Sequence, residues 1–159
     1  MRKKIKKELL KLFLGELLSS LLFLFCYFIW FKENQIQIAY PVALLCFILF
    51  QGSFYWLICL LKLNNNFNDI KYIKIFLIFK YVDIILLAVY IPILVFSPSI
   101  SKLYYIGSIF LISFTLIEYI NYYIVRLSYP KISILMEKIT NKKLTKSSLA
   151  KDIERIKNI

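Results

Sequence analysis

Four ionisable side chains stand inside long apolar stretches of this sequence, and they are the residues best placed to do chemistry. They are Glu16, Lys80, Asp83 and Glu118. A charged side chain at the centre of a membrane helix costs about 2.5–3.5 kcal/mol on insertion scales, so it needs a partner, a water-filled cavity or a proton. Lys80 and Asp83 are three positions apart, which puts them on one helix face and allows them to form an ion pair.

These four groups differ in how far they stand from the charges that flank their apolar runs. Glu16 and Lys80 lie within about 9 Å of helix rise from a flanking lysine, and the long stem of Lys80 can reach the membrane surface. Asp83 and Glu118 lie about 12–13 Å of helix rise from the nearest flanking basic residue, too deep for their side chains to reach the membrane surface easily. Those two carboxylates therefore most need a structural or functional explanation.

Polar residues at a similar depth in the second and fourth apolar runs extend this set into one expected polar layer. The candidate intramembrane site comprises Asp83, Glu118, Lys80, Glu16, Gln51, Asn121 and Tyr122. Such groups can join helices through hydrogen bonds or form an oligomer contact. They can also form a proton or cation pathway, because three carboxylates accompany a single lysine. All of these interpretations are open from the sequence.

The residues of the usual catalytic and metal sites are missing from the sequence. The chain has no histidine, which removes the commonest general base and metal ligand. Cys26, Cys46 and Cys59 lie in apolar runs without C-x-x-C spacing, so free thiols are expected, although a Cys26–Cys46 bridge is conceivable. The three glycines are too few for a nucleotide-binding loop and are expected at points of close helix packing. We expect no catalytic residue, no metal and no cofactor.

The elements that must position the polar layer are four apolar runs of about 20 residues, the length needed to cross ~30 Å of hydrocarbon. The chain has 159 residues, 60% of them hydrophobic, and its charges cluster between these runs. The sequence predicts an all-α integral membrane protein with spans at about 12–31, 38–61, 75–96 and 103–125. The transmembrane domain, 12–126, is expected between a polybasic N-terminus, 1–11, and a basic amphipathic tail, 127–159.

The net charge of +12 is distributed unevenly between the spans. Basic residues abound before the first span, between the second and third, and after the fourth, whereas the other two connections hold one each. The positive-inside rule then places both termini in the cytoplasm and the protein in the cytoplasmic membrane. This placement favours anionic inner-leaflet lipid as the partner, and not nucleic acid. The lysines expected to contact lipid or a partner are Lys3, Lys4, Lys6, Lys7, Lys142, Lys143 and Lys146.

The tail carries the sequence pattern of two short amphipathic helices. The first covers about 131–139. The second begins at Ser147 or Ser148, either of which can cap it, and its apolar side chains recur with helical spacing at Leu149, Ile153 and Ile156. So short a helix does not fold alone, and we expect it to rest on lipid, on the inner loop 62–74, or on a partner.

Tyrosine and tryptophan concentrate near the expected ends of the spans, where amphipathic rings anchor a protein at the membrane surface. At the inner surface these residues are Tyr55, Trp56, Tyr72 and Tyr123.

Two classes of function fit these observations. The first is a non-enzymatic membrane protein that acts through protein or lipid contacts, as an accessory subunit, a regulator or an immunity-type factor. It has either a membrane protein partner or a second copy of itself. The second is a small oligomeric transporter or channel coupled to protons or cations, with Glu118 and Asp83 as its coupling pair.

Overall fold

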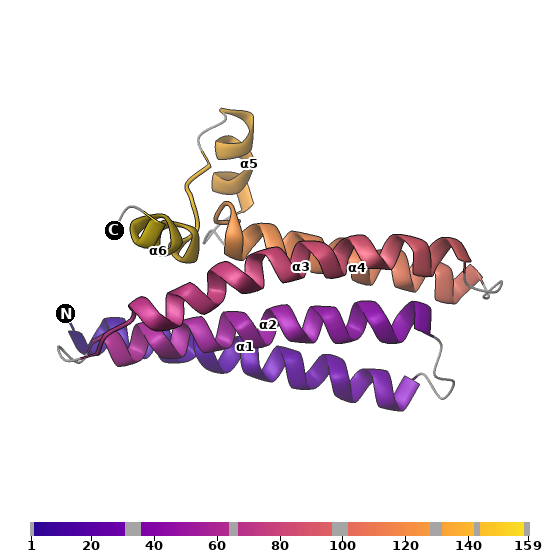
Figure 1. Ribbon diagram of the computed structural model, residues 1–159, viewed down its shortest axis with the longest axis horizontal. Helices are drawn as coiled ribbons and strands as arrows, with labels where there is room; N and C mark the ends of the chain where they lie inside the picture. The colour runs from indigo at the N-terminus through magenta and orange to yellow at the C-terminus, as the bar shows by residue number, and fades with distance from the viewer. Residues whose placement is uncertain are drawn as a thin grey trace.

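The computed structural model describes residues 2–30, 36–63, 67–96, 102–127, 132–141 and 144–157, and within these ranges every regular element is a helix. The helices, shown in Figure 1, are α1 (Arg2–Trp30), α2 (Ile36–Lys62), α3 (Ile70–Phe96), α4 (Lys102–Tyr123), α5 (Ile132–Thr140) and α6 (Ser148–Lys157). Helices α1 to α4 are long and apolar enough to cross a membrane. The all-α class and the four long apolar helices predicted from the sequence are confirmed in the described residues.

The long helices run beyond the apolar runs that mark them in the sequence. Helix α1 begins at Arg2, so the basic segment expected at 1–11 continues the first span as one helix. Helix α3 begins at Ile70, five residues before the expected span at 75. Lysine and isoleucine are compatible with an α-helix. The helical backbone therefore continues beyond the apolar run into residues whose charged side chains do not suit hydrocarbon. Hydropathy therefore locates the spans but not the ends of the helices.

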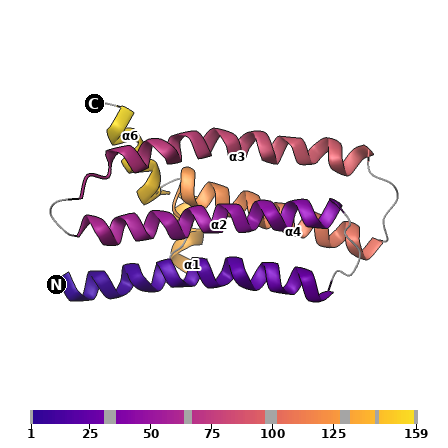
Figure 2. The same cartoon turned by 60° about the horizontal axis from the view of Figure 1, so that its bottom comes forward.

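Helix α2 is the centre of the bundle. In its most apolar window 56% of the residues are buried by the rest of the protein, against 11% for α1 and α3 and 17% for α4. Figure 2 shows α1, α2 and α3 in a row with α2 in the middle, and α4 behind that row. Both α1 and α4 pack closely on α2, whereas α3 and α4 touch each other less. Most apolar side chains of α1 and α3 consequently face outward.

A proline in α2 is accommodated by a side chain from α3. Pro41 has no N–H group and leaves the carbonyl of Gln37, four residues earlier, without its helical hydrogen bond. The hydroxyl of Tyr90 donates to that carbonyl at 3.1 Å. Tyr90 also stacks on Tyr40, whose own hydroxyl donates to the carbonyl of Leu86 at 2.7 Å. These contacts fix α3 against α2 at the end of the bundle away from the termini.

Helices α1 and α2 are joined by reciprocal polar contacts. The hydroxyl of Ser20 donates to the carbonyl of Cys46 at 3.2 Å, and the thiol of Cys46 donates to the carbonyl of Ser20 at 3.4 Å. The hydroxyl of Ser53 donates to the carbonyl of Phe13 at 3.2 Å. All three cysteines are free thiols, so the conceivable Cys26–Cys46 bridge is not formed.

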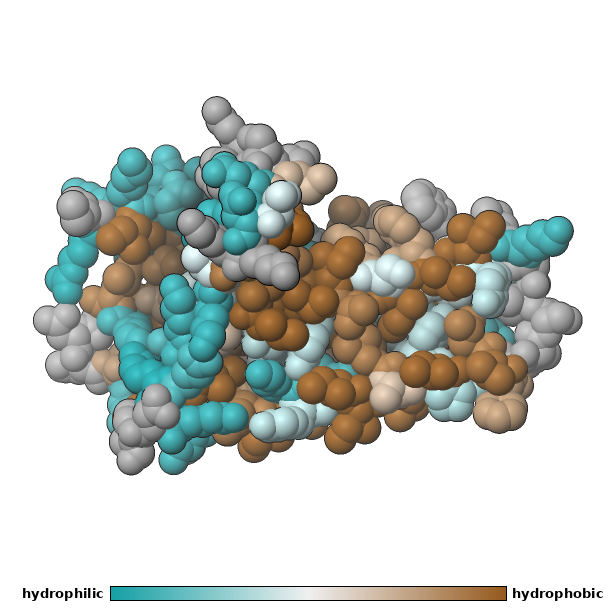
Figure 3. Space-filling model, turned by 90° about the horizontal axis from the view of Figure 1, so that it is seen from above, coloured by the Kyte–Doolittle hydropathy of each residue, from teal (hydrophilic) through white to brown (hydrophobic). Residues whose placement is uncertain are grey.

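The tail returns to the bundle at the end where both termini lie, which we call the basal end (Figure 1). After α4 the chain pairs with its own later part in an isolated antiparallel bridge between Val125 and Lys146. Helix α5 projects away from the bundle across the direction of the long helices, and α6 packs on α3 and α4. Figure 3 shows hydrophilic residues gathered over the basal end and a mostly hydrophobic surface along the rest of the bundle.

Ser147 caps α6, which was one of the two expected possibilities. Its side-chain oxygen accepts a hydrogen bond from the amide of Ala150 at 3.0 Å, the usual geometry of a serine cap. The apolar stripe of the helix is also as expected, with Leu149 and Ile153 buried and Ile156 packed beside them. Of the three supports considered for this helix, the structure provides the inner loop, through Asp69, together with packing on α3 and α4 that was not predicted.

Candidate functional site

A buried polar cluster joins α2, α3 and α4, and we define it as Gln51, Asp83 and Tyr123. The side-chain nitrogen Nε2 of Gln51 donates to Oδ1 of Asp83 at 2.9 Å, and the hydroxyl of Tyr123 donates to the side-chain oxygen Oε1 of Gln51. Asp83 has no exposed surface, and its Oδ2 has no hydrogen-bond partner among the described residues. The cluster is a short hydrogen-bonded chain across three helices.

The predicted pair of Lys80 and Asp83 is not formed. Asp83 faces Gln51 of α2, whereas Lys80 is half-buried and makes no ion pair with any residue that the structure describes. The backbone carbonyl of Lys80 instead accepts the hydroxyl of Tyr119 at 3.3 Å, which ties α4 to α3. Residues three positions apart lie on the same broad face of a helix. Here Asp83 points at the central helix α2, whereas Lys80 lies to one side of that contact.

Two carboxylates of the expected layer lie elsewhere, in what we call the acidic groove between α1 and α4. A cavity of about 280 Å³ is lined there by Glu16, Ser19 and Glu118, with Leu49 of α2 also in its lining. Glu118 accepts one long hydrogen bond, at 3.4 Å, from the amide of Asn121. The layer predicted from sequence is therefore divided between two sides of α2: Asp83 and Gln51 on one, Glu16 and Glu118 on the other.

A second cavity, of about 300 Å³, lies nearer the basal end, and we call it the basal cavity. It is bounded by α1, α2, α4 and the start of α6, and Glu16 lines both cavities. Asn121 and Tyr122, expected in the polar layer, line the basal cavity as well. The hydroxyl of Tyr122 interacts with the carboxylate of Glu16, and the charge of Glu118 also acts on this hydroxyl.

One of the three glycines has the close packing expected of all three. A Cβ atom built at Gly52 would stand 2.7 Å from Cε1 of Tyr122 and nearer still to the end of that ring, so glycine lets α4 approach α2. Gly15 and Gly107 have open space where a Cβ would stand. Gly52 therefore helps to place Tyr122 at the wall of the basal cavity.

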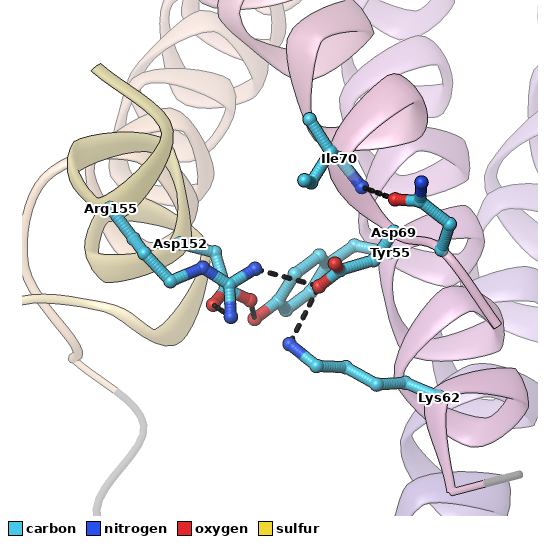
Figure 4. A network of polar contacts seen from close by, with 7 residues as sticks. Tyr55, Lys62, Asp69, Ile70, Asp152 and Arg155 are labelled. Atoms are coloured by element: carbon cyan, nitrogen blue, oxygen red, sulfur yellow. Dashed lines mark hydrogen bonds and ion pairs between the residues drawn. The ribbon is translucent and has the colours of Figure 1, made fainter. Parts of the chain in front are cut away.

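A network at the basal end holds α6 to the loop between α2 and α3 (Figure 4). Asp69 contacts Lys62 at 2.6 Å and Arg155 at 2.7 Å, and the hydroxyl of Tyr55 donates to Asp152 at 3.0 Å. Burial acts to raise the pKa of Asp69, but hydrogen bonds and charges from the two basic groups outweigh it and hold that pKa below its usual value. The hydrogen bond to Asp69 raises the pKa of Arg155.

The lysines expected to contact lipid or a partner fall into three groups. Those near the start of α1 are exposed at the basal end: Lys3, Lys4, Lys6 and Lys7. Lys146 pairs with Glu154 at 2.6 Å, so its charge is partly satisfied within the tail. Lys142 and Lys143 lie outside the described residues.

Tyr55 and Tyr123 have structural roles that were not predicted from the sequence. Both were expected to be anchors at the membrane surface, yet they are 2% and 1% exposed and hydrogen-bond to Asp152 and Gln51. Tyr119 stands one turn before Tyr123 and its ring packs against it, a spacing that could have indicated an inward face. Tyr55 and Tyr123 therefore belong to the core and not to the surface.

The described residues contain no group of three or more histidine, cysteine, aspartate or glutamate side chains that could hold a metal ion. Comparison of the chain with protein-family models, with curated proteins and with solved structures gave no match. The fold and the site define a small helical protein with four helices long and apolar enough to cross a membrane, in which Asp83 is buried between helices and Glu16 and Glu118 line a groove.

Proposed function

We propose that the protein acts through contacts inside the membrane, as an accessory subunit, regulator or immunity-type factor, and not through catalysis. The observation that carries this proposal is the acidic groove. Glu16 and Glu118 lie in apolar helices, where an uncompensated carboxylate is costly. Lys11, the basic residue in the same lining, is engaged with Glu8 at 3.5 Å. A basic side chain on a partner helix would satisfy both carboxylates.

The groove has the shape and position for such a partner. Helices α1 and α4 both pack on α2 and make few contacts with each other, so the space between them is open to a neighbouring helix. A second copy of the chain also offers a matching group, because Lys80 of α3 is half-buried and unpaired among the described residues. In a two-fold dimer through α4, the α1 side of each copy faces the α3 side of the other.

We infer that the basal end faces the cytoplasm and that the membrane is the cytoplasmic one. The exposed lysines at the start of α1, together with the described basic residues between α2 and α3 and in the tail, belong to that end. This distribution follows the positive-inside rule and suits contact with anionic lipid. A reporter fused after residue 159 that is active only in the cytoplasm tests this orientation, and inactivity there contradicts it.

Photo-crosslinking in cells tests the groove contact. A photoreactive residue at Ser19, inside the groove, should give a discrete protein adduct, whereas one at the exposed Leu22 of the same helix should give only lipid adducts. The double variant E16Q/E118Q should reduce the adduct about tenfold, since hydrogen bonds to charged groups are worth about 1.5–3 kcal/mol. Glu137→Gln, at an exposed glutamate of α5 outside the groove, is the matched control and should have no effect.

The mass of the adduct distinguishes the possible partners. A mass of twice 19.0 kDa identifies a second copy, in which case Lys80→Gln should also abolish it. Any other mass identifies a different subunit, whose crosslinked segment should carry a lysine or arginine. Adducts with lipid alone at both positions would falsify the proposed contact.

A second candidate function, transport of a proton or cation, is supported by one observation. Glu16 lines both cavities, so a single carboxylate stands between the basal end and the interior of the groove. Asp83, the other expected member of a coupling pair with Glu118, lines neither cavity. Proton or cation flux into liposomes that is lost in Glu16→Gln would favour transport, and absence of flux in the wild-type protein would dismiss it.

A further inference from the structure

Helix α5 has an apolar face that is exposed in the structure. Met136 is 60% exposed and Ile139 is 47% exposed, and the half-buried Leu135 lies on the same side of the helix, since these positions are three or four residues from Ile139. Glu137 lies on the opposite side and is exposed as well. Among the described residues, α5 packs closely on no other helix. This amphipathic helix therefore presents its apolar face outward.

A helix as short as α5 needs a surface to support it. Isolated helices of fewer than about 12–15 residues are marginal in water, and α5 has nine residues. Helix α6, of similar length, is supported within the chain, because Leu149 and Ile153 are buried where it packs on α3 and α4. Helix α5 lacks such burial at Met136 and Ile139, so its support lies outside the chain.

The direction and the level of α5 identify the membrane surface as that support. Figures 1 and 2 both show α5 crossing the direction of the long helices, beside the end of α4. Helix α4 has 22 residues and is about 33 Å long, close to the ~30 Å of hydrocarbon that a span must cross. With α4 in a membrane, its end at Tyr123 lies at the surface, and α5 lies parallel to that surface. Near α5, the hydrophilic surface of the basal end gives way to hydrophobic surface (Figure 3).

The sequence around α5 also carries the charge that suits an anionic lipid surface. Positions 131–143 contain four lysines and one glutamate. Helices that lie in a membrane interface combine an apolar face with basic residues, which are attracted to anionic headgroups. Both parts of this pattern are present in one short segment.

We propose that α5 is an interfacial helix that lies flat on the inner surface of the membrane, with Leu135, Met136 and Ile139 inserted between the lipids and Glu137 facing water. The proposal rests on the insertion of α1 to α4 in the membrane, which belongs to the proposed function. It adds a contact that lies outside the bundle and outside the acidic groove. Through this contact the lipid surface supports the segment that connects α4 to α6.

Photo-crosslinking of the whole chain in liposomes tests which surface covers α5. The liposomes contain phosphatidylcholine and phosphatidylglycerol, and a photoreactive residue is placed at Ile139, at Glu137 or at Leu22. Ile139 and Glu137 are two positions apart on opposite faces of α5. Leu22 is 60% exposed in α1 and reports on insertion of the long helices. We expect lipid adducts at Ile139 and Leu22 and none at Glu137.

The other outcomes of this experiment overturn the proposal in distinguishable ways. Absence of lipid adducts at Leu22 refutes insertion of the long helices, and with it the proposed function. Lipid adducts at Leu22 but not at Ile139 refute only the interfacial role of α5. An adduct of Ile139 with its own chain or with another protein shows that protein covers this face, and equal lipid adducts at Ile139 and Glu137 show that α5 does not lie with one face on the lipid.

A matched pair of serine variants measures how much the lipid contact stabilises α5. In the same liposomes, Ile139→Ser should lower the protection of the α5 amides against hydrogen exchange about tenfold, because it removes an apolar side chain from the interface. Glu137→Ser also introduces serine into α5 and should leave the protection unchanged. Protection in α2 should stay the same in both variants, which shows that the bundle is intact. Equal protection of α5 in the two variants would overturn the proposal.

Discussion

Replacing Gln51 with leucine should loosen the joint between α2, α3 and α4. The substitution leaves the carboxylate of Asp83 and the hydroxyl of Tyr123 without the hydrogen bonds that Gln51 makes with them. Side-chain hydrogen bonds between membrane helices are worth about 0.6 kcal/mol on average and up to about 1.7. Two such bonds predict a loss of about 1–3 kcal/mol in the free energy of unfolding.

The measurement is reversible unfolding in mixed micelles with increasing mole fractions of dodecyl sulfate. The triple variant Q51L/D83L/Y123F provides the decisive comparison, because it replaces every polar group of the cluster and leaves none unpaired. Exchanging all partners for apolar groups of similar shape is nearly neutral. The triple variant should therefore be more stable than Gln51→Leu. If the single variant unfolds like the wild type, or if the triple variant is the weaker of the two, the hydrogen-bonded chain does not hold these helices together.

Two further predictions concern packing and pH. Gly52→Ala should cost about 1–3 kcal/mol by forcing its methyl group against Tyr122, while Gly15→Ala, with open space at its Cβ, should be neutral in the same assay. The folded pKa of Asp69 lies below the unfolded value of about 3.9, so its contribution to docking of α6 is present above about pH 4 and is lost as the pH falls through the folded pKa. The protection of the α6 amides against hydrogen exchange, relative to the intrinsic rate at each pH, should fall in acid, and Asp69→Asn should remove that dependence; an equal acid response in the variant would contradict it. Arg155→Gln should accelerate exchange at neutral pH.

The sequence was sufficient to predict the four long helices and the buried character of Asp83. Predicting a span requires only the length and the average hydropathy of a segment, and both are local properties of the sequence. Asp83 was too deep to reach the surface, and it is buried, as that depth requires. The capped helix of the tail was also predictable, because Ser147 and the apolar spacing after it are neighbours in sequence.

The division of the polar layer into two sites was not predictable from one sequence. Depth along the membrane follows from residue counting, but direction around a helix depends on which neighbours surround it. Glu16 and Asp83 lie at comparable depth, yet α2 stands between the groove of one and the cluster of the other. Periodicity cannot show that α2 is central, since α1, α2 and α3 have nearly equal hydropathy, from 2.1 to 2.2. Tyr55 was misassigned for the same reason, since its partner lies 97 residues away in α6.

The docking of α6 also determines when during synthesis this fold can close. Helix α6 follows the four long helices in the chain, so Tyr55 lacks its partner Asp152, and Asp69 its partner Arg155, until the ribosome has passed residue 155. The four long helices can form before that moment, but the basal end is then incomplete. A chain that stops after α4 would have every span and still lack one wall of the basal cavity, since Ser148 and Leu149 belong to that wall.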